Sequence, residues 1–299
     1  MTIAVQTDML VKKFRRVDAL QGLTLQVPQG AVFALVGPNG AGKTTMIKVF
    51  MNVIRATSGR AEVLGVDSSR LRGRPLESIG YVSENQQLPD SMTVGTLLRY
   101  LQPFYPAWDT KLEAELVRQF DLPVNRKLRH LSRGMRMKAA LASSLAYHPK
   151  LIVLDEPFTG LDPLVRDELI QGLLERAEEC TVFVSSHDLG EIETFASHVA
   201  YLEDGRLRFS EELGSLVDRF REVELTFDTP LALPQKAPQS WLQLSSSAAV
   251  IRFIDCRFDA ERSAAQIRET FGEARNVTLS PMSLRSIFLT MAKSGKDSA

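Results

Sequence analysis

The feature that most constrains the fold is a glycine-rich segment that lies between an apolar run and a helical pattern. The segment GPNGAGKT at residues 37–44 matches the pattern G-x4-G-K-[ST]. The continuous apolar run 31–36 before it suits a strand buried on both faces, and residues 44–54 after it have helical composition and spacing. Strand, glycine-rich turn and helix in this order predict a phosphate-binding loop in a parallel α/β fold.

The chemistry of triphosphate binding explains this pattern of residues. Glycines let backbone N–H groups approach the phosphates, and the helix that follows presents its positive N-terminus to them. The pattern predicts that Lys43 reaches the outer phosphates and that the Thr44 hydroxyl binds Mg²⁺. A glycine-rich turn without a ligand is the alternative, and the flanking strand and helix argue against it. The predicted nucleotide-binding residues here are Gly37, Pro38, Asn39, Gly40, Ala41, Gly42, Lys43, Thr44 and Thr45.

A second apolar strand ends in two carboxylates. Residues 151–154 read LIVL and are followed by Asp155 and Glu156. Ligands of open α/β sheets bind outside the carboxyl ends of the strands, which is where these acids fall. We predict that Asp155 holds Mg²⁺ through water and that Glu156 is the general base for an attacking water. The alternative is that both acids only face solvent, and the phosphate loop in the same chain argues against it.

Apolar patterns place most of the chain in a parallel α/β fold. Helical segments between residues 93 and 147 are followed by strands that alternate with helices up to residue 196. Residues 229–240 hold three prolines and are predicted to form a linker or long loop, within a small α+β domain that begins near residue 220. The predicted strands are 9–11, 20–27, 31–36, 59–66, 78–82, 151–154, 181–184, 250–254 and 277–279, and the predicted helices outside 93–147 are 44–54, 163–177, 189–196, 261–271 and 284–291.

Composition narrows the range of functions. Lys and Arg number 36 and Asp and Glu number 36, so the net charge of zero gives no support for attraction of the whole protein to nucleic acid. No apolar run reaches the roughly 18–20 residues that cross a bilayer, and the first residues lack the apolar core of a signal peptide. Work at a membrane is therefore expected to need a partner. Cys180 and Cys256 form no ligand pattern and are expected to be reduced thiols.

Four further segments complete a resemblance to the nucleotide-binding subunit of ATP-binding cassette (ABC) transporters, over residues from about 10 to 205. The segment LSRGM at 131–135 lies shortly before the acidic strand, where the family has its LSGGQ signature. The segment TGLD at 159–162 resembles the family's D-loop, and SSHD at 185–188 resembles its switch-histidine segment. Phe14 stands where the family has an aromatic residue that stacks on adenine, with a core aromatic as the alternative.

The resemblance implies a fold and a set of domains. The implied fold is an α/β P-loop NTPase with a RecA-like parallel sheet core, an antiparallel β subdomain, a helical subdomain and a small C-terminal α+β domain. The ABC ATP-binding domain is expected at 1–218, with the helical subdomain at about 84–148. The accessory domain is expected at 219–299, and its spacing shows no chemistry that establishes a role.

The resemblance also implies roles for individual residues. ATP and Mg²⁺ are the expected cofactors, and His187 is expected to touch the γ-phosphate and orient the water beside Glu156. In the family the signature segment reaches across a dimer to the γ-phosphate held by the other subunit. The residues expected to act in trans are Ser132, Arg133, Gly134 and Met135, with Asp162 as a dimer contact.

Three residues depart from the family pattern. Glu84 stands in place of the Q-loop glutamine; a carboxylate is still able to bind Mg²⁺, so Glu84 is predicted as a metal ligand and catalytic residue, although it adds negative charge near the phosphates. Gln86 or Gln87 takes this place if the loop is shifted. Arg133 replaces a glycine and adds positive charge, whereas Met135 replaces a glutamine and lacks its amide.

The function implied by the resemblance is ATP hydrolysis by a pair of cassettes, identical or related, that drives a separate transmembrane permease. The exporter-type bacterial subgroup fits the altered signature best. The expected location is cytoplasmic, peripheral on the inner face of the cell membrane through the permease. Two alternatives stay open. One is a cassette with weak or no hydrolysis that pairs with an active cassette. The other is a soluble cassette ATPase on ribosomes or DNA, although the chain has one cassette, no heptad run and two scattered cysteines, and nucleic acid is not an expected partner.

Overall fold

The computed structural model describes residues 2–84, 86–177, 179–234 and 236–294, and side chains in the last helix up to residue 291. The chain divides into two compact units, Met1–Ser210 and Glu211–Ala299. This division falls a few residues before the limit at 218 that the sequence predicts. In the described part of the chain, no helix combines the length and the apolar character needed to cross a bilayer.

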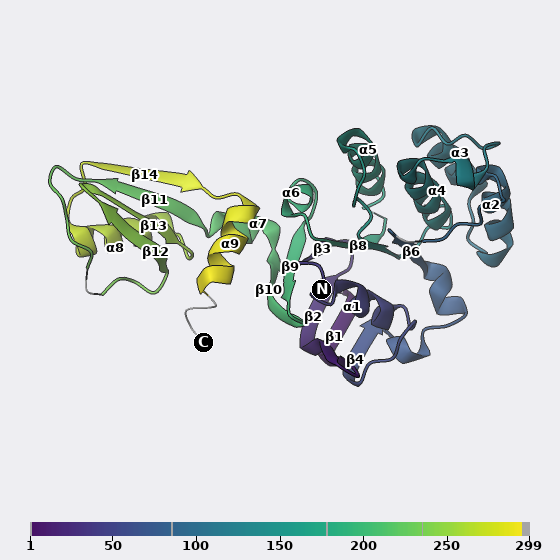
Figure 1. The fold of residues 1–299 in the computed structure, drawn as a ribbon, viewed down its shortest axis with the longest axis horizontal. Coiled ribbons are helices and arrows are strands. Elements are labelled where there is room, and N and C mark those ends of the chain that lie inside the picture. The colour runs from purple at the N-terminus through teal and green to yellow at the C-terminus, as the bar shows by residue number, and fades with distance from the viewer. Residues whose placement is uncertain (1, 85, 178, 235, 295–299) are drawn as a thin grey trace. The chain divides into compact units, whose positions relative to one another are not determined.

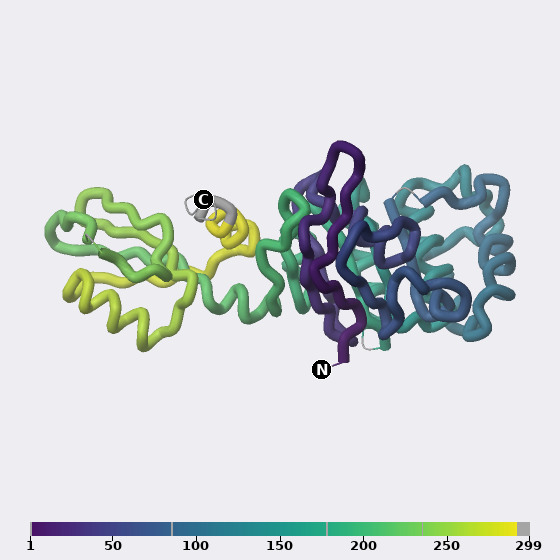
Figure 2. Tube along the Cα trace, turned by 90° about the horizontal axis from the view of Figure 1, so that it is seen from below, coloured from purple at the N-terminus to yellow at the C-terminus, as the bar shows by residue number. Residues whose placement is uncertain are grey.

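The first unit contains an antiparallel sheet in the order β2-β1-β4-β5. Its long hairpin, dark purple in Figure 2, stands out at the edge of this unit. The predicted strand 59–66 is wrong as a single strand, because Leu64 and Gly65 both have positive φ and turn the chain back on itself. The strands are β1 (Ile3–Phe14), β2 (Val17–Pro28), β4 (Ser58–Val63) and β5 (Val66–Asp67).

A second, six-stranded sheet forms the centre of the first unit, in the order β10-β9-β3-β8-β7-β6. The pairs from β9 through β3, β8 and β7 to β6 are parallel, and every residue of β3, β7 and β8 is buried, as their apolar runs predict. The strands are β3 (Val32–Val36), β6 (Ile79–Ser83), β7 (Leu151–Asp155), β8 (Thr181–Ser186), β9 (His198–Glu203) and β10 (Arg206–Glu212).

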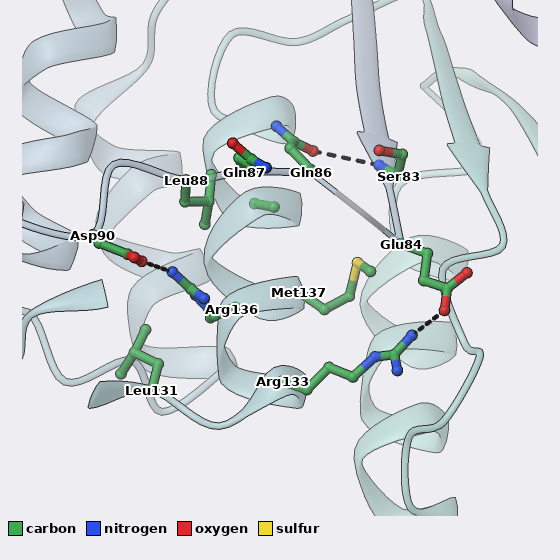
Figure 3. Close-up of a pocket in the computed structure, with 11 residues that line it drawn as sticks. Ser83, Glu84, Gln86, Gln87, Leu88, Asp90, Leu131, Arg133, Arg136 and Met137 are labelled. Atoms are coloured by element: carbon green, nitrogen blue, oxygen red, sulfur yellow. Dashed lines mark hydrogen bonds and ion pairs between the residues drawn. The ribbon is translucent and has the colours of Figure 1, made fainter. Parts of the chain in front are cut away.

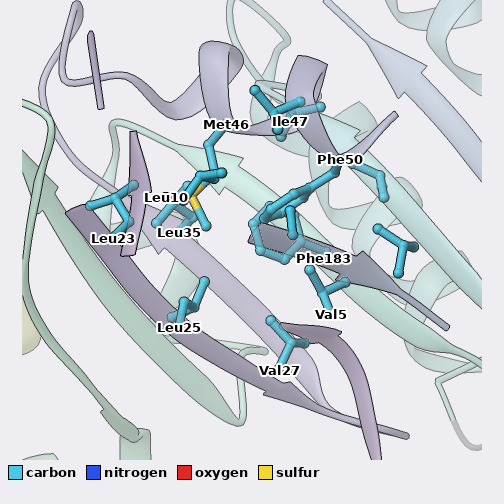
Figure 4. Packing of buried hydrophobic residues seen from close by; sticks show 14 of the residues in the cluster. Val5, Leu10, Leu23, Leu25, Val27, Leu35, Met46, Ile47, Phe50 and Phe183 are labelled. Atoms are coloured by element: carbon cyan, nitrogen blue, oxygen red, sulfur yellow. The ribbon is translucent and has the colours of Figure 1, made fainter. Parts of the chain in front are cut away.

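The main core fills the space between the two sheets around helix α1 (Lys43–Phe50). Apolar side chains of α1 pack against residues of β2 and of the central sheet (Figure 4). Phe183 of β8 lies at the centre of this core, with its ring stacked on Phe33 at 5.7 Å and in edge contact with Phe50 at 5.5 Å. The predicted helix 44–54 is too long, because Asn52 turns into the left-handed region and bonds Ser69 and Leu71 carbonyls.

Helices cover the opposite face of the central sheet, away from α1 and the antiparallel sheet (Figure 1). The predicted helical segment 93–147 forms three α-helices, of which α4 is buried along most of its length. The helices 163–177 and 189–196 are both shorter than the pattern predicts. The helices of this face are α2 (Val94–Leu101), α3 (Thr110–Gln119), α4 (Arg133–Leu145), α5 (Pro163–Leu174) and α6 (Leu189–Ile192).

The second unit is a four-stranded sheet in the order β12-β13-β11-β14 with helices against it. Its core is aromatic: Trp241 stacks on Phe253 at 4.2 Å and on Phe271 at 5.7 Å. The proline-rich stretch 229–240 connects β11 to β12, so it is a long loop inside this unit. The elements are α7 (Leu213–Asp218), β11 (Arg221–Thr226), β12 (Trp241–Ser247), β13 (Val250–Asp255), α8 (Ala260–Phe271), β14 (Asn276–Pro281) and α9 (Leu284–Ser294).

The central phenylalanine cluster gives a test of the core of the first unit. In a Trp241→Phe background, Trp108 is the remaining tryptophan and its fluorescence follows the first unit. We expect Phe183→Ala to lower the free energy of unfolding by about 3–5 kcal/mol, because the side chain is fully buried and leaves a cavity. Urea denaturation measures this loss. Phe104→Ala is the matched control: its ring is 59% exposed, and we expect a loss below about 1 kcal/mol. Equal losses in both variants would show that the cluster does not stabilise the unit.

Candidate nucleotide-binding site

The predicted phosphate loop connects β3 to α1, and two of its glycines are required by close backbone approaches. A Cβ at Gly37 would lie 2.1 Å from the Leu202 carbonyl oxygen. Gly42 has φ of 109° and a Cβ there would lie 2.5 Å from the Ala19 carbonyl oxygen. Any other residue at either position would force β9 or β2 away from the loop. Gly37 and Gly42 therefore allow the loop to lie close against β9 and β2.

Lys43 lies buried beneath this loop. Its Nζ donates to the carbonyl oxygens of Gly37 at 2.6 Å and of Pro38 at 3.2 Å. The same Nζ lies 3.0 Å from Glu156 Oε1, so the loop lysine and the acidic strand meet directly. The side chain is only 5% exposed, and a buried cation of this kind needs such partners. The contact places the only positive charge of the loop against the acidic pair at the end of β7.

Asp155 is the last residue of β7 and its carboxylate is fixed by two hydroxyl groups. Oδ1 accepts from Ser185 Oγ at 2.8 Å and from Thr44 Oγ1 at 3.1 Å. Burial raises the pKa of Asp155, the hydrogen bonds from Ser185 and Thr44 oppose this, and the negative charge of Glu156 adds to the rise, so that the pKa lies above its ordinary value. A nearby cation would favour the charged form, which is the state that binds metal.

Glu156 follows directly and has a different environment. Its backbone lies in the left-handed region at φ of 53°, and its N–H donates to Ser185 Oγ at 3.1 Å. Oε2 lies 2.8 Å from His187 Nδ1 and accepts from Thr159 Oγ1 at 3.1 Å. Burial raises the pKa of Glu156, but the hydrogen bonds and charges of His187 and Lys43 outweigh it, so the net shift is downward. Adjacent acids with opposite shifts are suited to different roles.

A pocket of about 130 Å³ opens beside these groups. Its chemistry fits Mg²⁺ bound with a nucleotide, because Mg²⁺ prefers oxygen ligands and uses one or two carboxylates together with phosphates and waters. Across the described residues, no three His, Cys, Asp or Glu side chains are grouped as a metal site, so a phosphate would have to complete the shell. The pocket is lined by Thr44, Lys48, Tyr81, Ser83, Glu84, Asp155 and Glu156.

Neither the signature residues nor Asp162 line this pocket. Ser132 is the N-cap of α4 and its Oγ accepts from the Met135 N–H at 3.2 Å. A Cβ at Gly134 would lie 2.7 Å from Val165 Cγ1 of α5, which explains the glycine. Asp162 caps α5 by accepting from the Val165 N–H. These contacts leave the predicted dimer roles as predictions.

Four other predicted residues lie in different places in the structure. Phe14 is 48% exposed at the end of β1 and lies under the ammonium of Lys12, so it is not a core aromatic, and its contact with adenine stays a prediction. Glu84 lines the small pocket, whereas Gln86 and Gln87 line only a larger neighbouring cleft. A shifted loop is therefore not needed to bring a side chain of this segment to the pocket.

Two residues of the site received no role from the sequence. Ser185 joins β8 to both acids, and Thr159 hydrogen-bonds Glu156. A polar residue at the carboxyl end of an otherwise apolar strand is a signal for Ser185, because parallel neighbours end at the same edge. Thr159 lacks such a signal, since its contact depends on how the loop after Glu156 turns.

Together the fold and the site define a P-loop nucleotide-binding cassette with an antiparallel subdomain and helices on the central sheet. Comparison with known proteins agrees with this class. The family profile described as ABC transporter matches residues 20–159. A solved structure, described as the ATP binding subunit of an ABC transporter, is 26% identical with a TM-score of 0.66, over 73% of this chain and 92% of that chain.

Two curated proteins extend the similarity. The ABC transporter ATP-binding protein YtrB of Bacillus subtilis (strain 168) is 30% identical over 218 residues, which cover 72% of this chain and 74% of that protein. The daunorubicin/doxorubicin resistance ATP-binding protein DrrA of Streptomyces peucetius is 30% identical over 308 residues, which cover 97% of this chain and 92% of that protein. The chain belongs to the family of ABC transporter ATP-binding proteins, in which binding and hydrolysis of ATP are general.

The acidic pair predicts a pH-dependent contribution of Glu156 to stability. Because its folded pKa is lowered, this contribution is complete above the ordinary glutamate value of 4.5 and is lost as pH falls through the lower folded pKa. We expect Glu156→Gln to lower the free energy of unfolding by about 1–3 kcal/mol near neutral pH, since Lys43 loses its charged partner. Urea denaturation should show this difference shrinking as pH falls below 4.5. Asp155 titrates in both proteins, and a difference that grows in acid would contradict the assignment.

Proposed function

We propose that this chain is an ATP-hydrolysing subunit that dimerises around ATP and drives a separate transmembrane permease. The observation that carries the proposal is the contact of Glu156 with both Lys43 and His187, at 3.0 and 2.8 Å. This arrangement joins a phosphate-binding cation, a general base and a histidine in one network. A cassette that only binds nucleotide has no need of the base or the histidine.

Each residue of the network has its own proposed role in ATP hydrolysis. Loop N–H groups and Lys43 bind the phosphates, and Thr44 and Asp155 hold the metal, which when bound neutralises charge on the phosphates. Glu156, kept ionised by its lowered pKa, accepts the proton of the attacking water. His187 is a second contact for that water and the γ-phosphate, because its ring already lies against Glu156. Glu84 lines the same pocket and is proposed as an additional metal ligand when it is free.

The dimer is proposed from the signature residues and Asp162. Ser132, Arg133, Gly134 and Met135 stand at the start of α4, so the N-terminus of a helix thirteen residues long is available to an anion from a second subunit. None of these four residues lines the small pocket of its own chain, although Arg133 contacts Glu84 at the edge of that pocket. Two copies, or one copy and a related cassette, would bring each signature segment to the partner's nucleotide. The aromatic ring of Phe14 is exposed for adenine in the same arrangement.

Export through a bacterial exporter-type permease is proposed from the similarity to the daunorubicin/doxorubicin resistance ATP-binding protein DrrA, which extends over 97% of this chain. We propose the domain limits 1–218 for the ATP-binding domain and 219–299 for an accessory domain. The subunit would then act in the cytoplasm, on the inner face of the membrane, through its permease. The net charge of zero supports no role for nucleic acid.

Steady-state ATP turnover tests the hydrolytic role. We expect the rate per chain to rise with protein concentration, because two subunits complete each site, and Glu156→Gln to lower kcat by roughly 10²–10⁴-fold, the usual contribution of a general base. Binding of a fluorescent ATP analogue should persist in the variant. Glu168→Gln, which breaks the ion pair between Glu168 of α5 and Lys138 of α4, is the matched control and should keep turnover within about twofold. Wild-type binding without turnover would instead favour a cassette that needs an active partner.

The permease partner is tested separately. We expect the tagged chain, isolated from gently solubilised membranes of its host, to retain a multi-spanning membrane protein that raises its ATP turnover. The same tagged chain with Lys43→Ala should retain less turnover, since the loop cation is gone. Recovery with ribosomes or DNA, and none with membranes, would favour the soluble alternative.

A further inference from the structure

Two of the residues that depart from the family pattern are in contact with each other. Arg133 Nη2 lies 2.5 Å from Glu84 Oε1, although the residues are far apart in sequence (Figure 3). Glu84 follows β6, and Arg133 is the first residue of α4. We propose that Arg133 is a positioning residue that masks the Glu84 carboxylate, so that the extra acid does not add a metal ligand to the phosphate pocket in the resting subunit.

The charge of the pocket explains why such a mask is needed. Glu84, Asp155 and Glu156 all line the same small pocket, where a triphosphate must also fit. Lys43 forms an ion pair with Glu156, while Asp155 accepts hydrogen bonds from two hydroxyl groups. A free third carboxylate would repel the phosphates, because the charges are alike, and would attract cations, because the charges are opposite. Both effects are strong between charged groups that share one small pocket. The guanidinium of Arg133 cancels that third charge.

A glycine in a third segment makes room for the guanidinium. A Cβ at Gly160 would lie 2.8 Å from Arg133 Nη1, and Gly160 itself has φ of 69°. Gly160 belongs to the loop that begins after Glu156 and ends at Asp162. Arg133 is thus held between the segment after β6 and the loop after β7. A side chain at 160 would displace the guanidinium and release Glu84.

The pair has little value for folding, which separates this role from a structural one. The side chains of Arg133 and Glu84 are 46% and 28% exposed, and ion pairs this open contribute little to stability. Arg136, one turn further along α4, pairs with Asp90 in the same cleft (Figure 3). Asp90 does not line the phosphate pocket, so this second pair is a matched control for charge, helix and cleft.

Binding of Mn²⁺ as a spectroscopic substitute for Mg²⁺, in the presence of a non-hydrolysable ATP analogue that supplies the phosphates, tests the mask without turnover. Electron paramagnetic resonance titrations would compare wild type, Arg133→Gln, Arg136→Gln, and Arg133→Gln combined with Glu84→Gln. We expect Arg133→Gln to bind Mn²⁺ about fivefold more tightly, the upper range for loss of a partly exposed ion pair. The double variant should return to the wild-type affinity, and Arg136→Gln should not differ from wild type. Gly160→Ala, which keeps the arginine, should shift affinity in the same direction as Arg133→Gln.

Two results would overturn the proposal: unchanged Mn²⁺ affinity in both Arg133→Gln and Gly160→Ala, or a rise that persists after Glu84→Gln. Circular dichroism of each variant verifies that the fold is kept. The inference rests on the proposed function only in taking this pocket as the metal and phosphate pocket. If the wild type shows no ATP turnover but the variants show the expected changes in Mn²⁺ affinity, the proposed hydrolysis is rejected and the mask is kept. If the wild type shows normal turnover but the variants show no such changes in Mn²⁺ affinity, the mask is rejected and the proposed hydrolysis is kept.

Discussion

The contact between Lys43 and Glu156 is the interaction on which the rest of the site depends. It joins the loop after β3 to the end of β7, two strands that are separated in the sheet by β8. The buried ammonium of Lys43 and the partly buried carboxylate of Glu156 each need a partner, and each is the partner of the other. Ser185 of β8, the strand between them, then fixes Asp155 through its hydroxyl. The order of strands thus decides which polar groups meet at the carboxyl edge of the sheet.

The same arrangement gives two neighbouring acids different properties. Burial raises the pKa of Asp155, which accepts hydrogen bonds from hydroxyl groups, whereas contacts with His187 and Lys43 outweigh burial and lower the pKa of Glu156. The opposite pKa shifts suit the two proposed roles, metal ligand for Asp155 and general base for Glu156. The sequence predicts both roles, whereas the directions of the two pKa shifts depend on the tertiary environment. Their backbone directions differ as well, since Glu156 turns into the left-handed region.

Two of the residues that depart from the family pattern are neighbours in the folded chain. Glu84 and Arg133 look like two separate weaknesses in the sequence, one at the Q-loop and one in the signature. In the fold their charges lie against each other, with Gly160 leaving space for the guanidinium. Met135 has no such partner role among its described contacts; its N–H is bound by the Ser132 cap. Because Glu84 and Arg133 carry opposite charges, the pair keeps the local net charge near that of the neutral glutamine and glycine of the family pattern.

The sequence by itself determined the phosphate loop, the acidic strand and the α/β class, because these follow from local patterns: a glycine motif, apolar runs buried on both faces, and helical spacing. It did not predict β9, β10, β11 or β12, whose residues are mixed in polarity, and it extended α1 past the turn at Asn52. Only the tertiary structure decided that Ser185 and Thr159 support the acids, that Phe14 is exposed, and that Arg133 meets Glu84. The physical reason is that periodicity reports which face of an element is buried, whereas contacts between distant segments depend on how the elements pack.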